Sequence, residues 1–207
     1  MTVIIDYGVG NLFSLKSSLN HIGFEAEISG DADIIKKAER IILPGVGAFR
    51  DAADKLSSLR LDDVLRESKN SGKPILGICL GMQLLFDKSL EYGEYPGLGF
   101  IHGEIRHIGE SIAPGLKIPH IGWNSLLFPR SKPKSELYRY ISEGDMVYFV
   151  HSYHACGCED SISAYTEYST LLTASCECGN VFGTQFHPEK SGEVGLEILR
   201  AFCGISA

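Results

Sequence analysis

A cysteine, a histidine and a glutamate have the types and spacing that could support nucleophilic chemistry. Cys79 lies between Gly77 and Gly81 in GICLGMQ, at the end of the apolar run PILGI (74–78). Flanking glycines permit a sharp strand-to-helix turn of the G-x-S-x-G kind, with cysteine in the place of serine. The start of a helix offers unpaired N–H groups and a positive dipole end, which both favour a thiolate. The pattern alone is compatible with a catalytic cysteine and with a buried structural one.

A thiol nucleophile needs a base, and the base needs a group that orients it. His187 follows the apolar run VFGTQF (181–186), and Glu189 stands two residues further on in the segment QFHPEKS. A turn at this point can aim the carboxylate at the imidazole. A His-Pro-Glu turn by itself also suits an exposed loop, but together with the Cys79 segment it predicts a Cys-His-Glu arrangement.

The first half of the chain alternates short β-branched runs with amphipathic stretches, which predicts a parallel, doubly wound sheet. In such sheets functional residues lie beyond the carboxyl ends of the strands, where Cys79 stands. The expected strands are 3–7, 24–28, 40–43 and 74–78, and the expected helices are 11–22, 51–59 and 81–88. One apolar stripe on the first of these helices should pack on the sheet, and it consists of Leu12, Leu15, Leu19 and Ile22.

The second half of the chain is interrupted more often by Gly and Pro, and its apolar runs are not separated by clear helices. This predicts mixed or antiparallel strands, followed by a closing helix. The expected strands are 146–150, 161–166, 171–176 and 181–186, and the expected helix is 194–202. No linker separates the halves, so residues 1–207 are expected to form a single domain.

The charge distribution bears on the class of partner. The formal net charge is −7, and Lys and Arg are scattered along the chain. This argues against a nucleic-acid surface or an anionic membrane patch and favours a small-molecule or protein partner. The first residues contain only a short apolar run and no basic leader, so we expect neither a signal peptide nor a membrane span, and a cytoplasmic location.

The six cysteines are expected to be reduced in that compartment. Two C-x-C pairs, Cys156/Cys158 and Cys176/Cys178, stand on or beside candidate neighbouring strands. Four thiolates could hold zinc, but structural zinc sites favour C-x₂₋₄-C spacing. We therefore expect unliganded thiols and no metal.

The segments GICLGMQ and TQFHPEKS together resemble the class I, or triad, glutamine amidotransferases, and the resemblance spans the whole chain. It implies an α/β, flavodoxin-like fold, with a central, mostly parallel mixed sheet flanked by helices and additional antiparallel strands in the second half. It also implies hydrolysis of L-glutamine to glutamate and ammonia without a cofactor. Cys79 would form a γ-glutamyl thioester, His187 would transfer the proton, and Glu189 would hold the imidazole.

Two donors are needed for the tetrahedral oxyanion of such a reaction. The backbone N–H of Leu80 is placed for one, and the loop LPGVGAF (43–49) should supply the other, by resemblance near Val46 and Gly47. A tight turn without a catalytic role is the alternative for this loop. For the amino and carboxylate groups of glutamine, the resemblance points to Gln83, Glu91, Ser152 and Tyr153.

Four further segments, KIPHIGWN, YFVHSYH, DYGVGN and PGVGAF, are similar to those of the glutaminase subunits of imidazole glycerol phosphate synthases. This implies a heterodimer with a (β/α)₈-barrel cyclase subunit, which receives the ammonia and makes imidazole glycerol phosphate and AICAR in histidine biosynthesis. Trp123, in a Pro/Gly-rich loop, is expected at the surface and not as a core anchor. The expected interface residues are Asn11, Trp123, Tyr148 and Lys190.

Three points stay open at the level of sequence. The same glutaminase chemistry could feed a paralogous synthase in sugar or glycan amination. The domain could instead be a catalytically silent regulatory module, although the complete set of Cys79, His187 and Glu189 argues against this. His151 either supports the strand end beside the site or is a packing residue.

Overall fold

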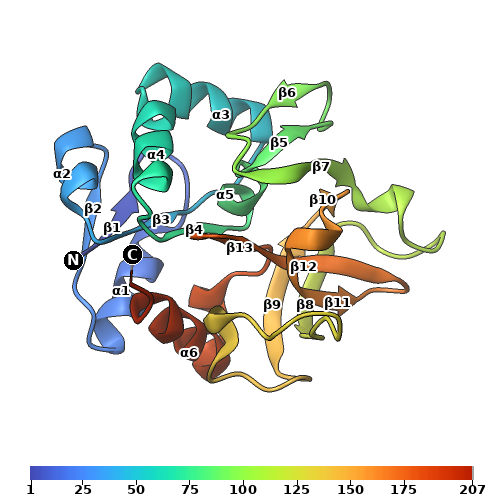
Figure 1. The fold of residues 1–207 in the computed structure, drawn as a ribbon. Helices are drawn as coiled ribbons and strands as arrows, with labels where there is room; N and C mark the ends of the chain where they lie inside the picture. Colours follow the sequence, from blue (N-terminus) through green and yellow to red (C-terminus); the bar gives the residue numbers. More distant parts are fainter. Residues whose placement is uncertain (207) are drawn as a thin grey trace.

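A seven-stranded mixed sheet forms the centre of the chain in the computed structural model, which describes residues 1–206 (Figure 1). Five neighbouring strands run parallel, and two antiparallel strands extend one edge. In order across the sheet, the strands are β11 (Ile162–Glu167), β12 (Leu171–Cys178), β13 (Val181–Thr184), β4 (Ile75–Ile78), β3 (Arg40–Leu43), β1 (Thr2–Ile5) and β2 (Ala26–Ser29).

The central parallel strands are buried on both faces because helices cover each side. Val3 and Ile5 of β1 belong to one core layer, and Ile4 belongs to the other. Strand β3 repeats the alternation with Ile41 and Ile42. The apolar, β-branched composition of these short runs therefore fills two cores at once.

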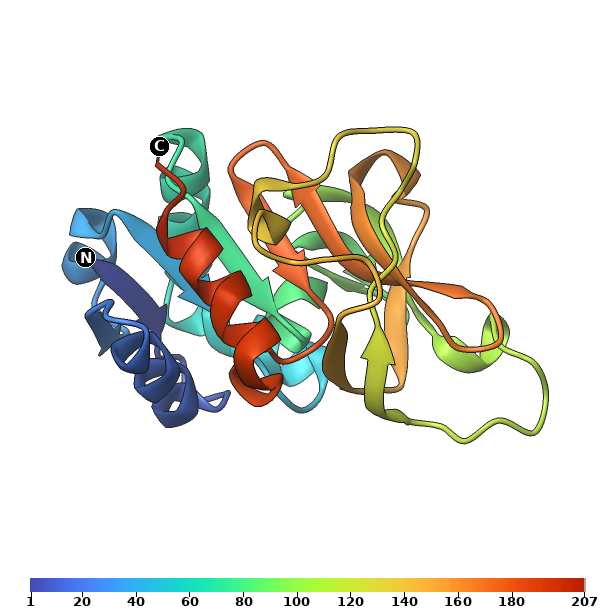
Figure 2. The same ribbon diagram turned by 90° about the horizontal axis from the view of Figure 1, so that it is seen from below.

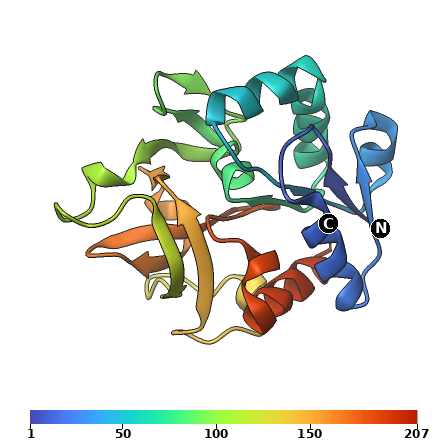
Figure 3. The same ribbon diagram turned by 180° about the vertical axis from the view of Figure 1, so that it is seen from behind.

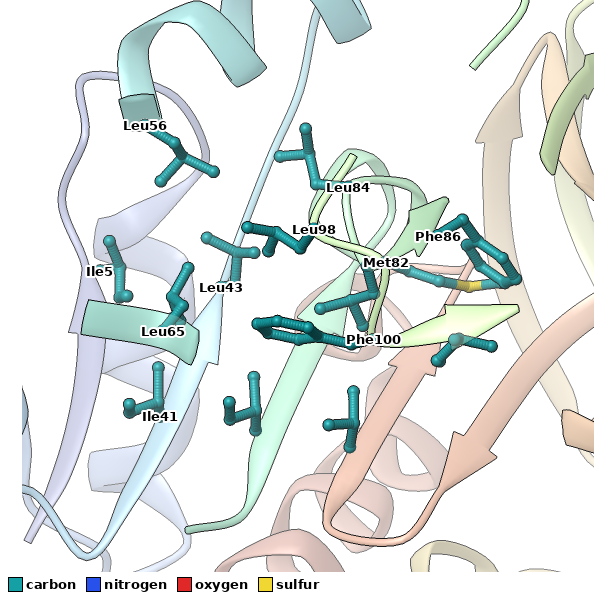
Figure 4. Packing of buried hydrophobic residues seen from close by; sticks show 14 of the residues in the cluster. Ile5, Ile41, Leu43, Leu56, Leu65, Met82, Leu84, Phe86, Leu98 and Phe100 are labelled. Carbon is teal, nitrogen blue, oxygen red and sulfur yellow. The ribbon is translucent and has the colours of Figure 1, made fainter. Parts of the chain in front are cut away.

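Helices lie on both faces of the sheet. Helices α1 (Leu12–His21) and α6 (Gly192–Cys203) lie side by side on one face (Figure 2). The other face carries α2 (Ala32–Lys37), α3 (Phe49–Ser58) and α4 (Leu61–Asn70). In Figure 4, Leu56 of α3 and Leu65 of α4 lie near Ile41 and Leu43 of β3, and all four belong to one buried cluster.

Two smaller sheets are built by strands from residues 86–156 (Figure 3). The four-stranded sheet has the order β10 (Tyr153–Cys156), β7 (Ile101–His107), β5 (Phe86–Ser89) and β6 (Tyr95–Pro96). An antiparallel ribbon consists of β8 (His120–Ser125) and β9 (Met146–His151). Only Ser152 separates β9 from β10, so the chain passes there from the ribbon to the four-stranded sheet. Short 3₁₀ turns are η1 (Ile108–Glu110), η2 (Glu136–Tyr138), η3 (Glu159–Ser161) and η4 (Pro188–Lys190).

Most of the expected strands and helices are present, with ends shifted by a few residues, but the helix expected over 81–88 is wrong. The chain forms a single helical turn, α5 (Leu80–Gln83), and then enters β5. Pairing of β5 with β6 and β7 overrides the helical spacing of the apolar residues there. Helices α2 and α4 and strands β6, β7, β8 and β10 were not expected.

Within residues 1–206, no helix is both long and apolar enough to cross a bilayer.

The apolar stripe on α1 predicts a contrast in stability between two positions of that helix. Leu19 is fully buried, whereas Phe13 is 81% exposed. We expect Leu19→Ala to lower the free energy of unfolding by about 2–5 kcal/mol, because it removes buried methyl groups and leaves a cavity. The matched control Phe13→Ala should change it by less than about 0.5 kcal/mol. Urea unfolding of both variants checks this, and equal losses would contradict the assigned orientation of α1.

Candidate active site

Cys79 directly follows β4 and has a strained backbone, with φ 54° and ψ −110°. A positive φ is unusual for a residue with a side chain and costs about 1–3 kcal/mol, so the surrounding structure must enforce it. The Cys79 N–H donates to the carbonyl oxygen of Thr184 at 2.7 Å, which fixes the turn to the end of β13. The sharp turn predicted from the sequence is therefore present.

The two flanking glycines are required by close backbone contacts. A Cβ atom on Gly77 would lie 2.6 Å from the carbonyl oxygen of Gly81, and one on Gly81 would lie 1.9 Å from that of Leu43. Both distances are shorter than any real Cβ contact. The glycines thus let β4, α5 and the end of β3 approach one another beneath the thiol.

The helix dipole invoked for the thiolate is smaller than the sequence suggested. Helix α5 has four residues, so few aligned peptides contribute to it. The Cys79 Sγ atom has two other neighbours, the carbonyl oxygen of Val150 at 4.0 Å and Nε2 of Gln185 at 3.7 Å. Gln185 was not identified from the sequence as a site residue, although it lies in the QFHPEKS segment.

His187 and Glu189 form a buried pair. Their Nδ1 and Oε1 atoms are 2.8 Å apart, and both side chains are almost fully buried. The backbone N–H of His187 donates to the carbonyl oxygen of Tyr148. Ser191 Oγ donates to the carbonyl oxygen of His187. These bonds fix the backbone of His187 between β9 and η4, and the contact with Glu189 orients its imidazole.

The proton affinity of His187 is set by competing effects. Burial lowers its pKa, but interactions with Cys79 and Glu189 outweigh burial and raise the pKa to about 9. Within the described residues, Nε2 of His187 and Oε2 of Glu189 make no hydrogen bond. Because Nδ1 faces the carboxylate, Nε2 is the ring atom left free for proton transfer.

A cavity of about 440 Å³ opens above Cys79 and His187. Glu189 does not line it and lies behind His187. The cavity lining includes every residue expected for the oxyanion or for glutamine, namely Val46, Gly47, Leu80, Gln83, Glu91, Ser152 and Tyr153. The structure thus brings together segments that lie more than a hundred residues apart in the sequence.

Two of the expected binding residues already have internal partners. Glu91 Oε2 accepts from the backbone N–H of Phe49 at 2.6 Å, at the start of α3. Gln83 Nε2 donates to the carbonyl oxygen of Tyr153 at 3.3 Å and to Gln185 Oε1 at 3.1 Å. These contacts fix the side chains at the cavity wall.

A buried histidine pair, His120 and His151, lies at the cavity wall and is not evident from the sequence. His151 Nδ1 lies 2.8 Å from the carbonyl oxygen of Tyr153, and His151 Nε2 lies 3.1 Å from His120 Nδ1. Burial lowers the pKa of His151 to about 3 and also lowers that of His120, so both rings are neutral near pH 7. His151 is both packed among these rings and bonded to the strand end, so the structure agrees with each of its two interpretations.

The expected interface residues lie on β8, β9 and η4 and just before α1. Trp123 is 52% exposed, but it belongs to β8 and not to a loop. It is opposite Tyr148 of β9, with ring centroids 6.1 Å apart. Lys190 lines the cavity, and Asn11 immediately precedes α1, which contacts η4. Pairing with β9 explains why the Pro/Gly-rich segment is nevertheless a strand.

The C-x-C cysteines lie in different surroundings. The Sγ atoms of Cys158 and Cys176 are 3.9 Å apart and buried, whereas Cys178 is exposed and Cys156 lies beside His154. Over residues 1–206 no group of three or more His, Cys, Asp or Glu side chains is placed to hold a metal.

The close contact at Gly81 predicts a large loss of stability on adding one methyl group. Gly81→Ala should lower the free energy of unfolding by more than about 3 kcal/mol, because the backbone of β3 must move. Gly204→Ala is the matched control, since its Cβ would meet atoms only at 3.4 Å or beyond. Thermal unfolding of both variants measures the difference, and a stable Gly81→Ala protein would refute the described packing.

The raised pKa of His187 predicts a pH-dependent contribution to stability. The protonated imidazole stabilises the fold fully below pH 6.5, and this contribution is lost as the pH rises through about 9. The difference corresponds to roughly 3 kcal/mol. Free energies of unfolding of the wild type and His187→Gln, measured from pH 6 to 10, should converge across this range. Parallel curves would show that the pKa of His187 is not raised.

The amino-acid sequence matches one protein family over almost its whole length. A family model described as glutamine amidotransferase class-I matches residues 3–204. Relatives named imidazole glycerol phosphate synthase subunit HisH are 48% identical in Aquifex aeolicus (97% of this chain, 95% of that protein) and 45% identical in Oceanobacillus iheyensis (98% of each). A third, from Caldanaerobacter subterraneus subsp. tengcongensis, is 48% identical (98% of this chain, 97% of that protein).

Solved structures show the same fold at lower identity. A crystal structure of a glutamine amidotransferase has a TM-score of 0.74 at 18% identity, covering 97% of this chain and 98% of that one. The structure of PurLQS from Thermotoga maritima also gives 0.74, at 21% identity and with 98% and 96% coverage. These likenesses confirm the expected α/β fold class. The chain therefore belongs to the glutamine amidotransferase class-I family, as its two motif segments predicted, and its relatives within that family include HisH subunits.

Proposed function

We propose that this chain is the glutaminase subunit of an imidazole glycerol phosphate synthase and hydrolyses L-glutamine with Cys79, His187 and Glu189. The observation that carries the proposal is the strained Cys79 turn, which shares one cavity with His187 of the buried His187–Glu189 pair. The cavity contains polar groups on several sides, as a small polar substrate requires. Relatives at 45–48% identity over nearly the whole chain support the synthase assignment.

The proposed reaction begins with attack of Cys79 Sγ on the side-chain amide carbon of glutamine. The raised pKa of His187 means that the imidazole is already protonated near pH 7, and its positive charge stabilises negative charge on the sulfur. His187 then gives this proton to the departing ammonia, while Glu189 stabilises the cation. Water, deprotonated by the now neutral imidazole, releases glutamate from the thioester.

The oxyanion of the tetrahedral intermediate is assigned to backbone N–H groups at Leu80 and at the Val46–Gly47 peptide. All three residues line the cavity, and Gly47 has a φ of 98°, which glycine adopts without strain. A Cβ atom on Gly47 would meet nothing within 4 Å, so that side of the loop is uncrowded. This loop can therefore turn an N–H toward the substrate when the complex assembles.

The ribbon β8–β9 is the proposed docking surface for the (β/α)₈-barrel cyclase. Its outer face carries two cross-strand apolar pairs, Ile121 with Val150 and Trp123 with Tyr148. Ile121 and Trp123 are both more than half exposed, whereas Val150 lines the cavity. An apolar, aromatic surface that adjoins the site is suited to a partner that receives ammonia directly.

Replacement of the nucleophile should separate chemistry from folding. Cys79→Ala and Cys79→Ser should reduce glutamine hydrolysis to background while the fold and cyclase binding survive. The side chain is small, but it is buried and not solvent-facing, so a modest loss of stability is expected. Glutamate release, circular dichroism and co-purification with the cyclase test this. Near wild-type turnover in either variant would remove Cys79 as the nucleophile.

The oxyanion loop predicts dependence on the partner. The isolated chain should bind glutamine but hydrolyse it slowly, and the cyclase with its phosphoribulosyl-formimino nucleotide substrate should raise kcat by at least about 10²-fold. Gly47→Pro removes an N–H and should abolish most of this stimulation while Cys79 stays reactive toward iodoacetamide. Steady-state kinetics of the chain alone and in the complex measure the effect. Equal rates would eliminate the partner-gated loop.

The same experiment discriminates between synthases. Glutamine-dependent formation of imidazole glycerol phosphate by the reconstituted pair supports the histidine pathway. Hydrolysis that is stimulated only by a paralogous barrel would assign the chain to sugar or glycan amination, and no turnover with either would indicate a silent module.

A further inference from the structure

Gln185 occupies a position between the nucleophile and the substrate wall of the cavity. It directly follows β13, precedes His187 by two residues and is completely buried. Its Nε2 atom lies 3.7 Å from Cys79 Sγ, and its Oε1 atom lies 3.1 Å from Gln83 Nε2. The side chain therefore connects the sulfur to the residue expected to contact glutamine.

The orientation of the Gln185 amide is determined by its neighbours. Gln83 Nε2 also lies 3.3 Å from the carbonyl oxygen of Tyr153, which can only accept a hydrogen bond. The Gln83 group facing both partners must therefore be its NH₂, and the Gln185 atom that it contacts must be the oxygen. The NH₂ of Gln185 is consequently the group that faces Cys79.

The two polar neighbours of the sulfur favour different protonation states. The carbonyl oxygen of Val150, at 4.0 Å, can only accept, so it can interact favourably with the S–H of a thiol. The N–H of Gln185 donates, and a donor binds a thiolate more strongly than a thiol. Because α5 is only one turn long, its dipole contributes little at the sulfur. Gln185 is a fixed neutral donor there.

We propose that Gln185 is a further catalytic residue, whose N–H stabilises the Cys79 thiolate and aims it at the substrate, with its own amide locked by Gln83 and the Tyr153 carbonyl. This role deepens the proposed glutaminase function and rests on it. Formation of the thioester converts the sulfur to a much weaker acceptor, so the bond is strongest before attack. It therefore favours the reactive form of the free enzyme.

Several ionisable groups surround the sulfur, and the test must leave them unchanged. Cys79 raises the pKa of His187 and, after burial, contributes to the raised pKa of Tyr7. The other ionisable side chains around the cavity are Glu91, Tyr92, His107, His151, Tyr153 and Lys190. Substitution of Gln185 by a neutral residue alters none of their charges, so a change in the behaviour of Cys79 reports the lost donor.

The test is the pH dependence of Cys79 alkylation by iodoacetamide in the full chain, followed by mass spectrometry of the Cys79 peptide. Gln185→Met keeps an unbranched side chain of similar length but has no donor. Its alkylation midpoint should move upward by about 1–2 pH units, the effect expected from losing a hydrogen bond to a charged group. The exposed Cys178 in the same sample is an internal control and should keep its profile.

A second control separates the donor from general loss of buried polarity. Thr173 is buried, and its Oγ1 donates to the carbonyl oxygen of Ala155 at 2.9 Å, away from the sulfur. Thr173→Val should leave the Cys79 profile at its wild-type position. In Gln185→Met, glutaminase kcat at pH 7 should fall about 10- to 100-fold with little change in KM, since the donor acts on the sulfur and not on glutamine.

An unchanged Cys79 profile in folded Gln185→Met would overturn the proposal and leave Gln185 a packing residue. If that variant does not fold, Gln83→Met is measured instead, because it releases the lock on the Gln185 amide. An upward shift there supports the proposal, and no shift refutes it. Alkylation needs no glutamine turnover, so a failed glutaminase assay on wild-type protein would refute the proposed function without deciding the Gln185 result.

Discussion

The positive φ of Cys79 is the constraint on which the candidate site depends. Such a conformation persists only where neighbouring structure enforces it. Here the ends of three adjacent strands do so: the Leu43 carbonyl of β3 abuts Gly81, β4 leads into the cysteine, and the Thr184 carbonyl of β13 accepts its N–H. The parallel sheet is therefore more than a support. Its strand ends determine the position of the sulfur.

A second constraint is the buried pair of His187 and Glu189. Burying two ionisable groups is costly unless geometry and hydrogen bonds compensate. The 2.8 Å contact provides the geometry, and the bonds from His187 to Tyr148 and from Ser191 to His187 hold the backbone. The free Nε2 is the consequence, since every other polar atom of the histidine has a partner within the described chain. The raised pKa places a positive charge beside the sulfur.

Local sequence patterns predicted those parts of the fold that depend mainly on residues near one another in the sequence. Short apolar runs identified the parallel strands, and glycine spacing identified the turn at Cys79, because steric contacts there leave no alternative. The stretch after α5 was assigned incorrectly, because β5 exists only through pairing with β6 and β7, which lie later in the chain. Gln185 was overlooked for the same reason: its partners are more than a hundred residues away, and glutamine has no recognisable spacing of its own.

Strand β9 lies between the proposed docking surface and the candidate active site, and its successive side chains point alternately to its two faces. Tyr148 and Val150 point to the outer face of the ribbon, whereas Phe149 and His151 point inward. The backbone of Tyr148 accepts the His187 N–H, and its own N–H donates to Ser191 Oγ, which in turn donates to the His187 carbonyl. This closed set of bonds includes His187, the base of the proposed reaction. A partner that contacts Trp123 and Tyr148 therefore acts on the strand that holds His187, and under the proposed function no longer relay of side chains is needed between docking and catalysis.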